Sequence, residues 1–165
     1  MDEKKAVSNS NNSKQTTFEE LLEQNGYFVY TNVGRSMMPL VRQRRDIIEI
    51  HKKGPDRCKK YDVVLYKRGE RYILHRILEV LPDGKYIIAG DKNTFLEKDI
   101  TDDQILGVMT RVIRDGKSIY ADDKAYKAYV HLWCDAYQVR MGVLKAERKT
   151  RAGLRKAVKL LSSKG

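Results

Sequence analysis

The chain has 165 residues, of which 41% are hydrophobic and 33% charged, and its formal net charge is +11 at pH 7. This length allows one domain with a real core plus tails, and the composition is typical of a soluble globular protein. No run approaches the ~18 apolar residues of a membrane helix, and the polar N-terminus lacks the apolar centre of a secretory signal. We therefore expect a cytoplasmic protein.

The N-terminal part predicts a disordered tail followed by a short helix. Residues 1–16 are polar and rich in Ser and Asn, which favours disorder. Thr17, with Glu20 three residues later, has the pattern of a helix capping box, and Gly26 is a typical residue at a helix end. We expect the helix to lie between these two signals.

The middle of the chain has the two-residue period of β-strands. Turn signals such as 82–84 (PDG) and 115–116 (DG) separate short apolar segments, and no helical pattern lies between them. This favours a mostly antiparallel β domain over 17–122, including the short helix. The expected strands are Tyr27–Val33, Asp46–His51, Asp62–Lys67, Tyr72–Val80, Tyr86–Ala89, Ile105–Ile113 and Ser118–Tyr120.

The last part, 123–165, predicts basic amphipathic helices. From Gln138 onwards there are nine Lys or Arg residues and one acidic residue, which is +8 of the net charge. An apolar face accompanies this charge and is formed by Leu144, Leu154, Val158 and Leu161. Such a helix suits peripheral contact with an anionic membrane. Packing on the domain, an acidic partner or nucleic-acid phosphates would use the same pattern, but no base-reading element is visible, so no specific nucleic acid is expected.

Segment 34–39, with the sequence GRSMMP, is the first candidate for chemistry. It stands between two expected strands, where Gly34 permits unusual backbone angles and Pro39 fixes the exit of the turn. A serine presented on such a turn has its own backbone N–H beside it, which is a natural oxyanion donor. Ser36 is therefore a candidate nucleophile, although Gly, Ser and Pro also make ordinary loops.

A serine nucleophile needs a base, and the chain has three histidines: His51, His75 and His131. Ile73, His75 and Ile77 share one face of an expected strand, where burial can tune the pKa of the imidazole. Segment 89–93, AGDKN, ends another strand and offers Asp91 to orient that imidazole. Taken singly, these two segments also fit a half-buried histidine and an ordinary turn.

Four segments occur in a specific order: GRSMMP (34–39), DVVLY (62–66), LHRI (74–77) and AGDKN (89–93). Together they resemble the signal-peptidase/LexA-like serine peptidases, and most closely the branch with a histidine base, the endoplasmic-reticulum and spore-former type. The resemblance covers 27–114. It implies the family's antiparallel β fold, no metal or cofactor, and a catalytic triad of Ser36, His75 and Asp91. This branch often has a second acid after AGDKN; the candidates are Glu97, Asp99 and Asp102.

The chain also departs from that family. The membrane anchor that precedes the serine in the family is replaced by a polar tail and short helix. Gly34 stands where lysine-type members have a hydroxyl residue, so the oxyanion loop of Gly34, Ser36 and Met37 is left with the Ser36 backbone N–H as donor. A repressor-type interpretation would need a lysine in place of His75 and an N-terminal DNA-binding domain.

We therefore expect a cytoplasmic serine endopeptidase that processes a peptide or protein precursor, with small residues beside the scissile bond. The alternative is a non-catalytic peptide-binding module whose basic tail contacts a membrane or an acidic partner.

Overall fold

A computed structural model describes the backbone of residues 16–162 and the side chains of 16–155, apart from positions 137, 138 and 148. The tail expected over 1–16 lies outside the described residues except for Thr16. Helix α1 (Phe18–Asn25) begins and ends where its signals predicted. The Thr17 side chain accepts a hydrogen bond from the Glu20 amide, the Glu20 carboxylate accepts one from the Thr17 amide, and Gly26 ends the helix at φ 76°.

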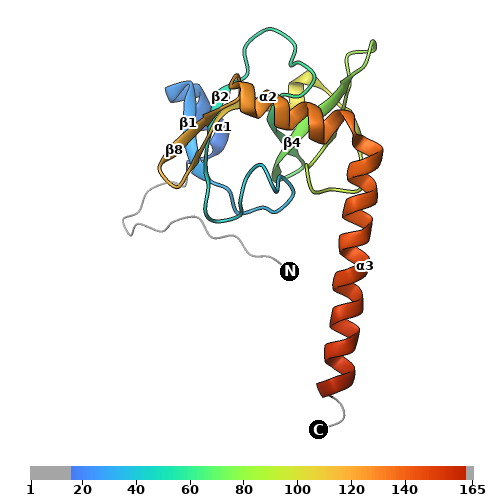
Figure 1. Ribbon diagram of the computed structural model, residues 1–165. Helices are drawn as coiled ribbons and strands as arrows, with labels where there is room; N and C mark the ends of the chain where they lie inside the picture. Colours follow the sequence, from blue (N-terminus) through green and yellow to red (C-terminus); the bar gives the residue numbers. More distant parts are fainter. Residues whose placement is uncertain (1–15, 163–165) are drawn as a thin grey trace.

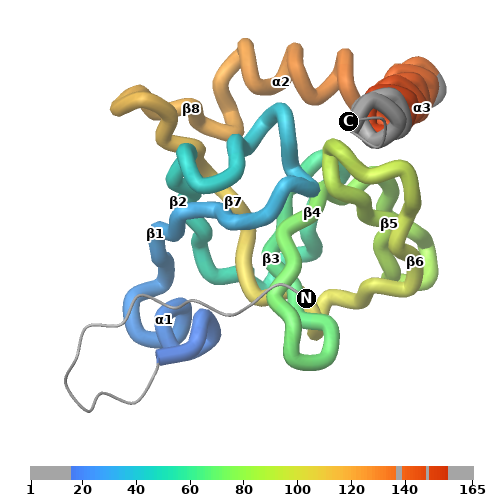
Figure 2. Tube along the Cα trace, turned by 90° about the horizontal axis from the view of Figure 1, so that it is seen from below, coloured from blue at the N-terminus to red at the C-terminus, as the bar shows by residue number. Residues whose placement is uncertain are grey.

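Eight strands of the described residues form one antiparallel sheet, so the expected mostly β fold with flanking helices is confirmed. The strand order is β1-β2-β7-β3-β4-β5-β6, and β8 pairs with β7. Figure 2 shows the strongly curved path of these strands. The bounds are β1 (Tyr27–Thr31), β2 (Ile47–Lys52), β3 (Val63–Arg68), β4 (Arg71–Val80), β5 (Tyr86–Ala89), β6 (Glu97–Ile100), β7 (Ile105–Arg114) and β8 (Lys117–Tyr120).

Strand β6 is the one strand that the sequence pattern did not predict. Its residues Glu97, Lys98 and Asp99 are poor strand formers, so no apolar run marks the segment. Only its first and last residues, Glu97 and Ile100, are buried, and pairing with β5 holds it in place. Tertiary contacts, rather than local preference, therefore determine this strand.

Two hydrophobic clusters lie on opposite sides of β3 and β4, because consecutive side chains of a strand point to opposite faces. Val63, Leu65 and Leu74 belong to the first cluster, together with residues of α1 and of the loop that follows Ser36. Val64, Tyr66 and Ile77 belong to the second, under β5 and β6. His75 lies on the second face, since it pairs with Val64 across the two strands.

The C-terminal part is helical, as predicted, and its first portion packs on the β domain. Helix α2 (Lys124–Val130), the π-helical segment η2 (His131–Asp135) and helix α3 (Tyr137–Ser162) follow one another. Tyr126, Val130 and Cys134 are buried in the first cluster. Helix α3 then runs away from the sheet (Figure 1). Among the described residues, no helix has the length and apolar content required to cross a membrane.

Candidate active site

Ser36 lies in the loop between β1 and β2, where two features set its backbone. The buried Asn32 brackets the turn before it: its Nδ2 donates to the Gly34 carbonyl at 2.8 Å, and its Oδ1 accepts from the Gly34 amide at 3.3 Å. Met37, directly after the serine, is 1% exposed and anchors the loop in the first cluster. Ser36 is thus held partly exposed between two fixed neighbours.

The turn after β5 presses directly against Ser36. The Lys92 amide donates to the Ser36 carbonyl at 2.7 Å. A Cβ atom at position 90 would lie 2.6 Å from that carbonyl oxygen and 2.7 Å from the Ser36 Cβ, closer than real Cβ contacts come. Gly90 is therefore required for this close approach, so the GRSMMP and AGDKN segments meet in space.

His75 of β4 is 4% exposed and is held from both ring nitrogens. Its Nδ1 lies 3.0 Å from Oε1 of Glu97, and its Nε2 lies 3.2 Å from Nδ2 of Asn93. An amide nitrogen can only donate, so Nε2 accepts and Nδ1 carries the proton that is donated to Glu97. This is the tautomer that a general base acting through Nε2 requires.

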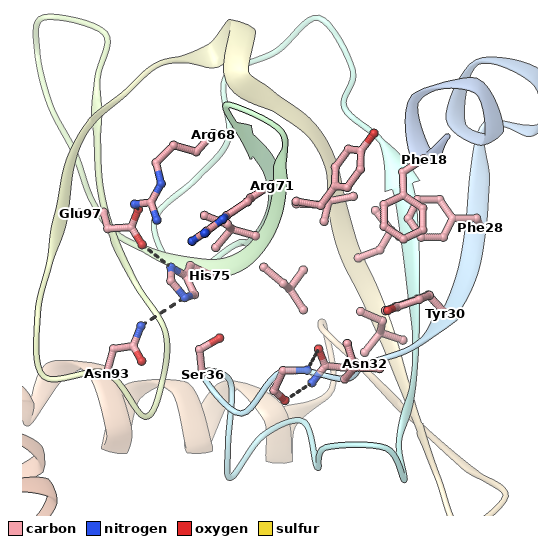
Figure 3. A pocket seen from close by; sticks show the side chains of 18 of the residues that line it. Phe18, Phe28, Tyr30, Asn32, Ser36, Arg68, Arg71, His75, Asn93 and Glu97 are labelled. Carbon is pink, nitrogen blue, oxygen red and sulfur yellow. Dashed lines mark hydrogen bonds and ion pairs between the residues drawn. The ribbon is translucent and has the colours of Figure 1, made fainter. Parts of the chain in front are cut away.

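Glu97 is buried and has three partners around its carboxylate. Tyr66 donates its hydroxyl to Oε2 at 2.8 Å, Arg68 pairs with the same oxygen, and Oε1 faces His75. The Tyr66 hydroxyl also lies 3.3 Å from Nδ1 of His75. The carboxylate is thereby oriented toward the imidazole, as Figure 3 shows. Of the acidic candidates for this site, Glu97 is the one that contacts the histidine.

Burial dominates the titration of His75. Removal from water disfavours the imidazolium and lowers the pKa of His75 below its ordinary 6.5, although the charge of Glu97 and its hydrogen bond act in the opposite direction. The imidazole is therefore neutral at neutral pH and free to accept a proton. Glu97 is placed to stabilise the imidazolium that would follow.

Asp91 does not take the place beside His75 that the resemblance implies: among the described side chains its carboxylate bonds Arg76 and Tyr129 instead. Its two carboxylate oxygens accept from Nε and Nη2 of Arg76 at 2.9 and 2.8 Å, and Tyr129 donates to Oδ2 at 3.0 Å. Both Asp91 and Arg76 are fully buried. The physical reason is the two-residue period of β4: Arg76 points to the opposite face from His75, and Asp91 follows the arginine. Asp91 thus braces the turn that holds Ser36.

The two other acids also have partners other than His75. The side chain of Asp99 is 77% exposed and pairs with Lys85 at 3.0 Å. Asp102 accepts from the Tyr86 hydroxyl at 2.7 Å and pairs with Lys53. Neither contacts the histidine, so the choice that the sequence left open falls on Glu97.

Ser36 and His75 line the same pocket, which has a volume of about 790 Å³. Figure 3 shows both side chains at one end and Phe18, Phe28 and Tyr30 at the other. Among the described side chains no hydrogen bond joins Ser36 to His75. The Ser36 amide N–H has no acceptor within the described part of the chain, and Ser36 lines the pocket, whereas Met37 is buried and is not among the lining residues.

Three contributors to the site were not assigned a role from sequence. Asn93 and Tyr66 lie inside two of the recognised segments, but only the structure shows that they contact His75 and Glu97. Tyr66 could have been predicted in part, because the pairing of β3 with β4 places it on the same face of the sheet as His75. Asn32 is a typical turn residue, and nothing in the sequence predicts its two hydrogen bonds to the Gly34 backbone.

No protein-family model matches the chain, and no curated protein matches it either. Within the described residues there is no group of three His, Cys, Asp or Glu side chains that could hold a metal ion. What the arrangement can do therefore follows from the geometry itself. One pocket contains a serine with an unpaired backbone amide and a neutral buried histidine with a carboxylate partner. These are parts that acyl transfer needs.

Proposed function

We propose that this protein is a serine endopeptidase with Ser36 as nucleophile, His75 as general base and Glu97 as the group that orients His75. The observation that carries the proposal is the 3.0 Å contact between Nδ1 of His75 and Glu97, in the pocket that Ser36 also lines. The contact leaves Nε2 as the basic nitrogen. The resemblance of the four segments to histidine-type signal peptidases supports the same roles for Ser36 and His75.

The chemistry follows the usual order for a serine nucleophile. Oγ of Ser36 attacks the substrate carbonyl while Nε2 of His75 takes its proton, and the imidazolium later returns that proton to the leaving amine. The amide of Ser36 is the available donor to the oxyanion. Asn93, which holds Nε2 at 3.2 Å, has to release it when substrate binds.

The pocket suits an extended peptide. Residues Arg71–His75 of β4 pair with β3 on one side, whereas β5 begins to pair only from Arg76 onwards. Strand β1 pairs with β2 alone among the described strands. The backbone groups on these unpaired edges are available for a substrate strand, as in other cases of strand addition. The related signal peptidases lead us to propose small side chains beside the scissile bond.

One observation favours a second candidate, a peptide-binding module without catalysis. Nε2 of His75 is bonded to Asn93 rather than to Ser36. In such a module this bond would persist with ligand bound, and Ser36 would remain unreactive. The pocket and the unpaired strand edges would serve equally well for binding.

We also propose peripheral contact of helix α3 with an anionic membrane on the cytoplasmic side. Of the apolar face expected from the sequence, Leu154 is exposed and Leu144 is buried, while the side chains of Val158 and Leu161 lie outside the described residues. Val139 and Val143 are exposed, and their spacing places them on the same face of the helix as Leu154. The basic residues of the chain's end accompany this stripe. An apolar stripe beside a strong positive charge is the pattern of helices that lie in the headgroup region.

Cleavage of an extended peptide with a central Ala-Ala bond tests the proposed activity, with products identified by mass spectrometry. The wild type is expected to cleave the peptide, and Ser36→Ala to fold normally without cleaving it. Arg35→Ala, next to the nucleophile but not in the pocket, is the matched control and should retain activity. Cleavage that survives in Ser36→Ala would remove the mechanism.

A further inference from the structure

Arg71, at the start of β4, lines the pocket but has no partner among the described side chains. Within the described part of the chain its guanidinium forms no hydrogen bond or ion pair, whereas the neighbouring Arg68 pairs with Glu97. Figure 3 shows the Arg71 side chain directed into the pocket, on the side of His75 and Glu97. A guanidinium that faces a binding pocket with all five donors unused is placed to receive an anion.

The charge of the pocket wall points the same way. Among the residues that line it, Arg68 and Arg71 are positive and Glu97 is the one acidic residue. Because Arg68 and His75 already occupy the carboxylate of Glu97, no negative group is left in the pocket to balance Arg71. The unbalanced positive charge favours an acidic ligand group at this position.

The position of Arg71 along β4 indicates how far its charge lies from the scissile bond of a bound substrate. Arg71, Ile73 and His75 lie on one face of the strand, so Arg71 is four residues from the proposed base. Four residues of a strand span about 13 Å. Because the arginine side chain is long, its guanidinium can lie closer to His75 than this distance along the backbone. We therefore expect it opposite a substrate residue about two to four positions from the scissile bond.

We propose that Arg71 determines specificity by binding the carboxylate of an Asp or Glu in the substrate, two to four positions from the scissile bond. This inference rests on the proposed peptide-binding pocket and deepens the proposed function. The planar fork of the guanidinium matches a carboxylate with two parallel hydrogen bonds. Recognition of an acidic residue near a small-residue bond would let the enzyme select one precursor among many peptides.

Binding and cleavage are measured separately, so that failure of the Arg71 proposal can be distinguished from failure of the proposed peptidase activity. Fluorescent peptides with a central Ala-Ala bond carry one Asp at successive positions, and matched peptides carry Asn there. Binding to the Ser36→Ala protein is followed by fluorescence anisotropy. We expect the best Asp peptide to bind about tenfold more tightly than its Asn partner, as a charge-assisted hydrogen bond provides, with the preference decreasing as salt is added.

Two variants that each remove one positive charge distinguish binding at Arg71 from attraction by the overall positive charge of the protein. Arg71→Gln should lose the preference for Asp, whereas Arg155→Gln, on the exposed part of α3, should keep it. In the cleaving enzyme, Arg71→Gln should raise KM for the Asp peptide with little change in kcat. No binding of Asp peptides, or an Asp preference that persists in Arg71→Gln, would overturn the inference. Selective binding without cleavage would instead contradict the proposed catalysis and leave Arg71 as the anion site.

Discussion

At the scale of single residues, the environments of two carboxylates decide their roles. Asp91 forms a doubly hydrogen-bonded pair with the fully buried Arg76, and Glu97 contacts the imidazole of His75. Removal of one partner from a buried ion pair typically costs about 3–5 kcal/mol, because the remaining charge is left unpaired. Asp91 is therefore a structural residue, whereas Glu97 is the proposed partner of the base.

The first prediction concerns the pH dependence of catalysis. Since burial lowers the pKa of His75, kcat/KM should rise with pH through a midpoint below 6.5 and level off at neutral pH. Glu97→Gln should reduce the rate about 10²–10⁴-fold. Because Glu97 raises the pKa of His75, this variant should also move the midpoint to lower pH.

Arg68→Gln is the matched control for that shift. The positive charge of Arg68 lowers the pKa of His75, so removal of that charge should move the midpoint upward. Rate profiles of the three proteins across acidic and neutral pH check both directions. A midpoint that stays the same in Glu97→Gln would contradict the proposed contact between Glu97 and the catalytic base.

At the scale of elements, the site depends on contacts between segments that are far apart in the chain. The loop after β1 touches the turn after β5, and the turn is bonded in addition by the C-terminal helices. Trp133 of η2 donates its indole N–H to the Asp91 carbonyl at 2.9 Å, while Tyr129 of α2 bonds the Asp91 carboxylate. The C-terminal segment thus helps to hold the turn that contacts Ser36.

The second prediction tests the contact between loop and turn. Gly90→Ala should displace Ser36, because the added methyl group would lie 2.6 Å from the Ser36 carbonyl oxygen. Activity should fall by at least an order of magnitude, roughly as small misplacements of a reacting group do. Gly54→Ala has open space around the new methyl group and should retain activity. Equal activity of the two variants would show that the contact is unimportant.

The third prediction tests the support from η2. Trp133→Phe leaves the Asp91 carbonyl without its indole donor and should lower the free energy of unfolding by about 1–3 kcal/mol. Leu132→Ala, one residue earlier, changes a side chain that is 76% exposed and should have little effect. Chemical denaturation of both variants provides the comparison, and equal stabilities would contradict the role of Trp133.

These contacts also show which parts of the structure can be predicted from the sequence. The capping box of α1, the alternation of β4 and the turn glycines are local signals, and the elements they predict are present. Strand β6 lacks such a signal. Because Glu97 is its first residue, the sequence does not predict that Glu97 lies beside His75. The partner of His75 depends on a pairing between β5 and β6 that local preference does not encode.

At the scale of the whole molecule, most of the net positive charge lies on a helix that extends away from the β domain. At the base of α3, Met141 and Leu144 are buried, whereas the outer part of the helix runs away from the β domain with Leu154 61% exposed (Figure 1). The chain's last 28 residues carry most of the net positive charge. This division places the proposed membrane contact on a helix that is distinct from the pocket.

The fourth prediction concerns that helix. The protein should co-sediment with vesicles that contain phosphatidylglycerol, bind weakly to vesicles of phosphatidylcholine alone, and dissociate as salt is raised. Leu154→Asp should reduce binding about tenfold or more, since it places a charge in the apolar stripe. Ala152→Asp adds the same charge to the polar side of the helix and should bind better than Leu154→Asp. Equal affinity for the two vesicle types would contradict the proposal.

The central claim is that Ser36 is an activated nucleophile, and covalent labelling tests it most directly. The wild-type protein is treated with a fluorophosphonate probe at pH 7 and above, and its intact mass and labelled peptide are determined. We predict one adduct, located on Ser36, that is absent in Ser36→Ala and forms far more slowly in Glu97→Gln. A folded wild-type protein that remains unlabelled, or an adduct that persists in Ser36→Ala, would contradict the claim.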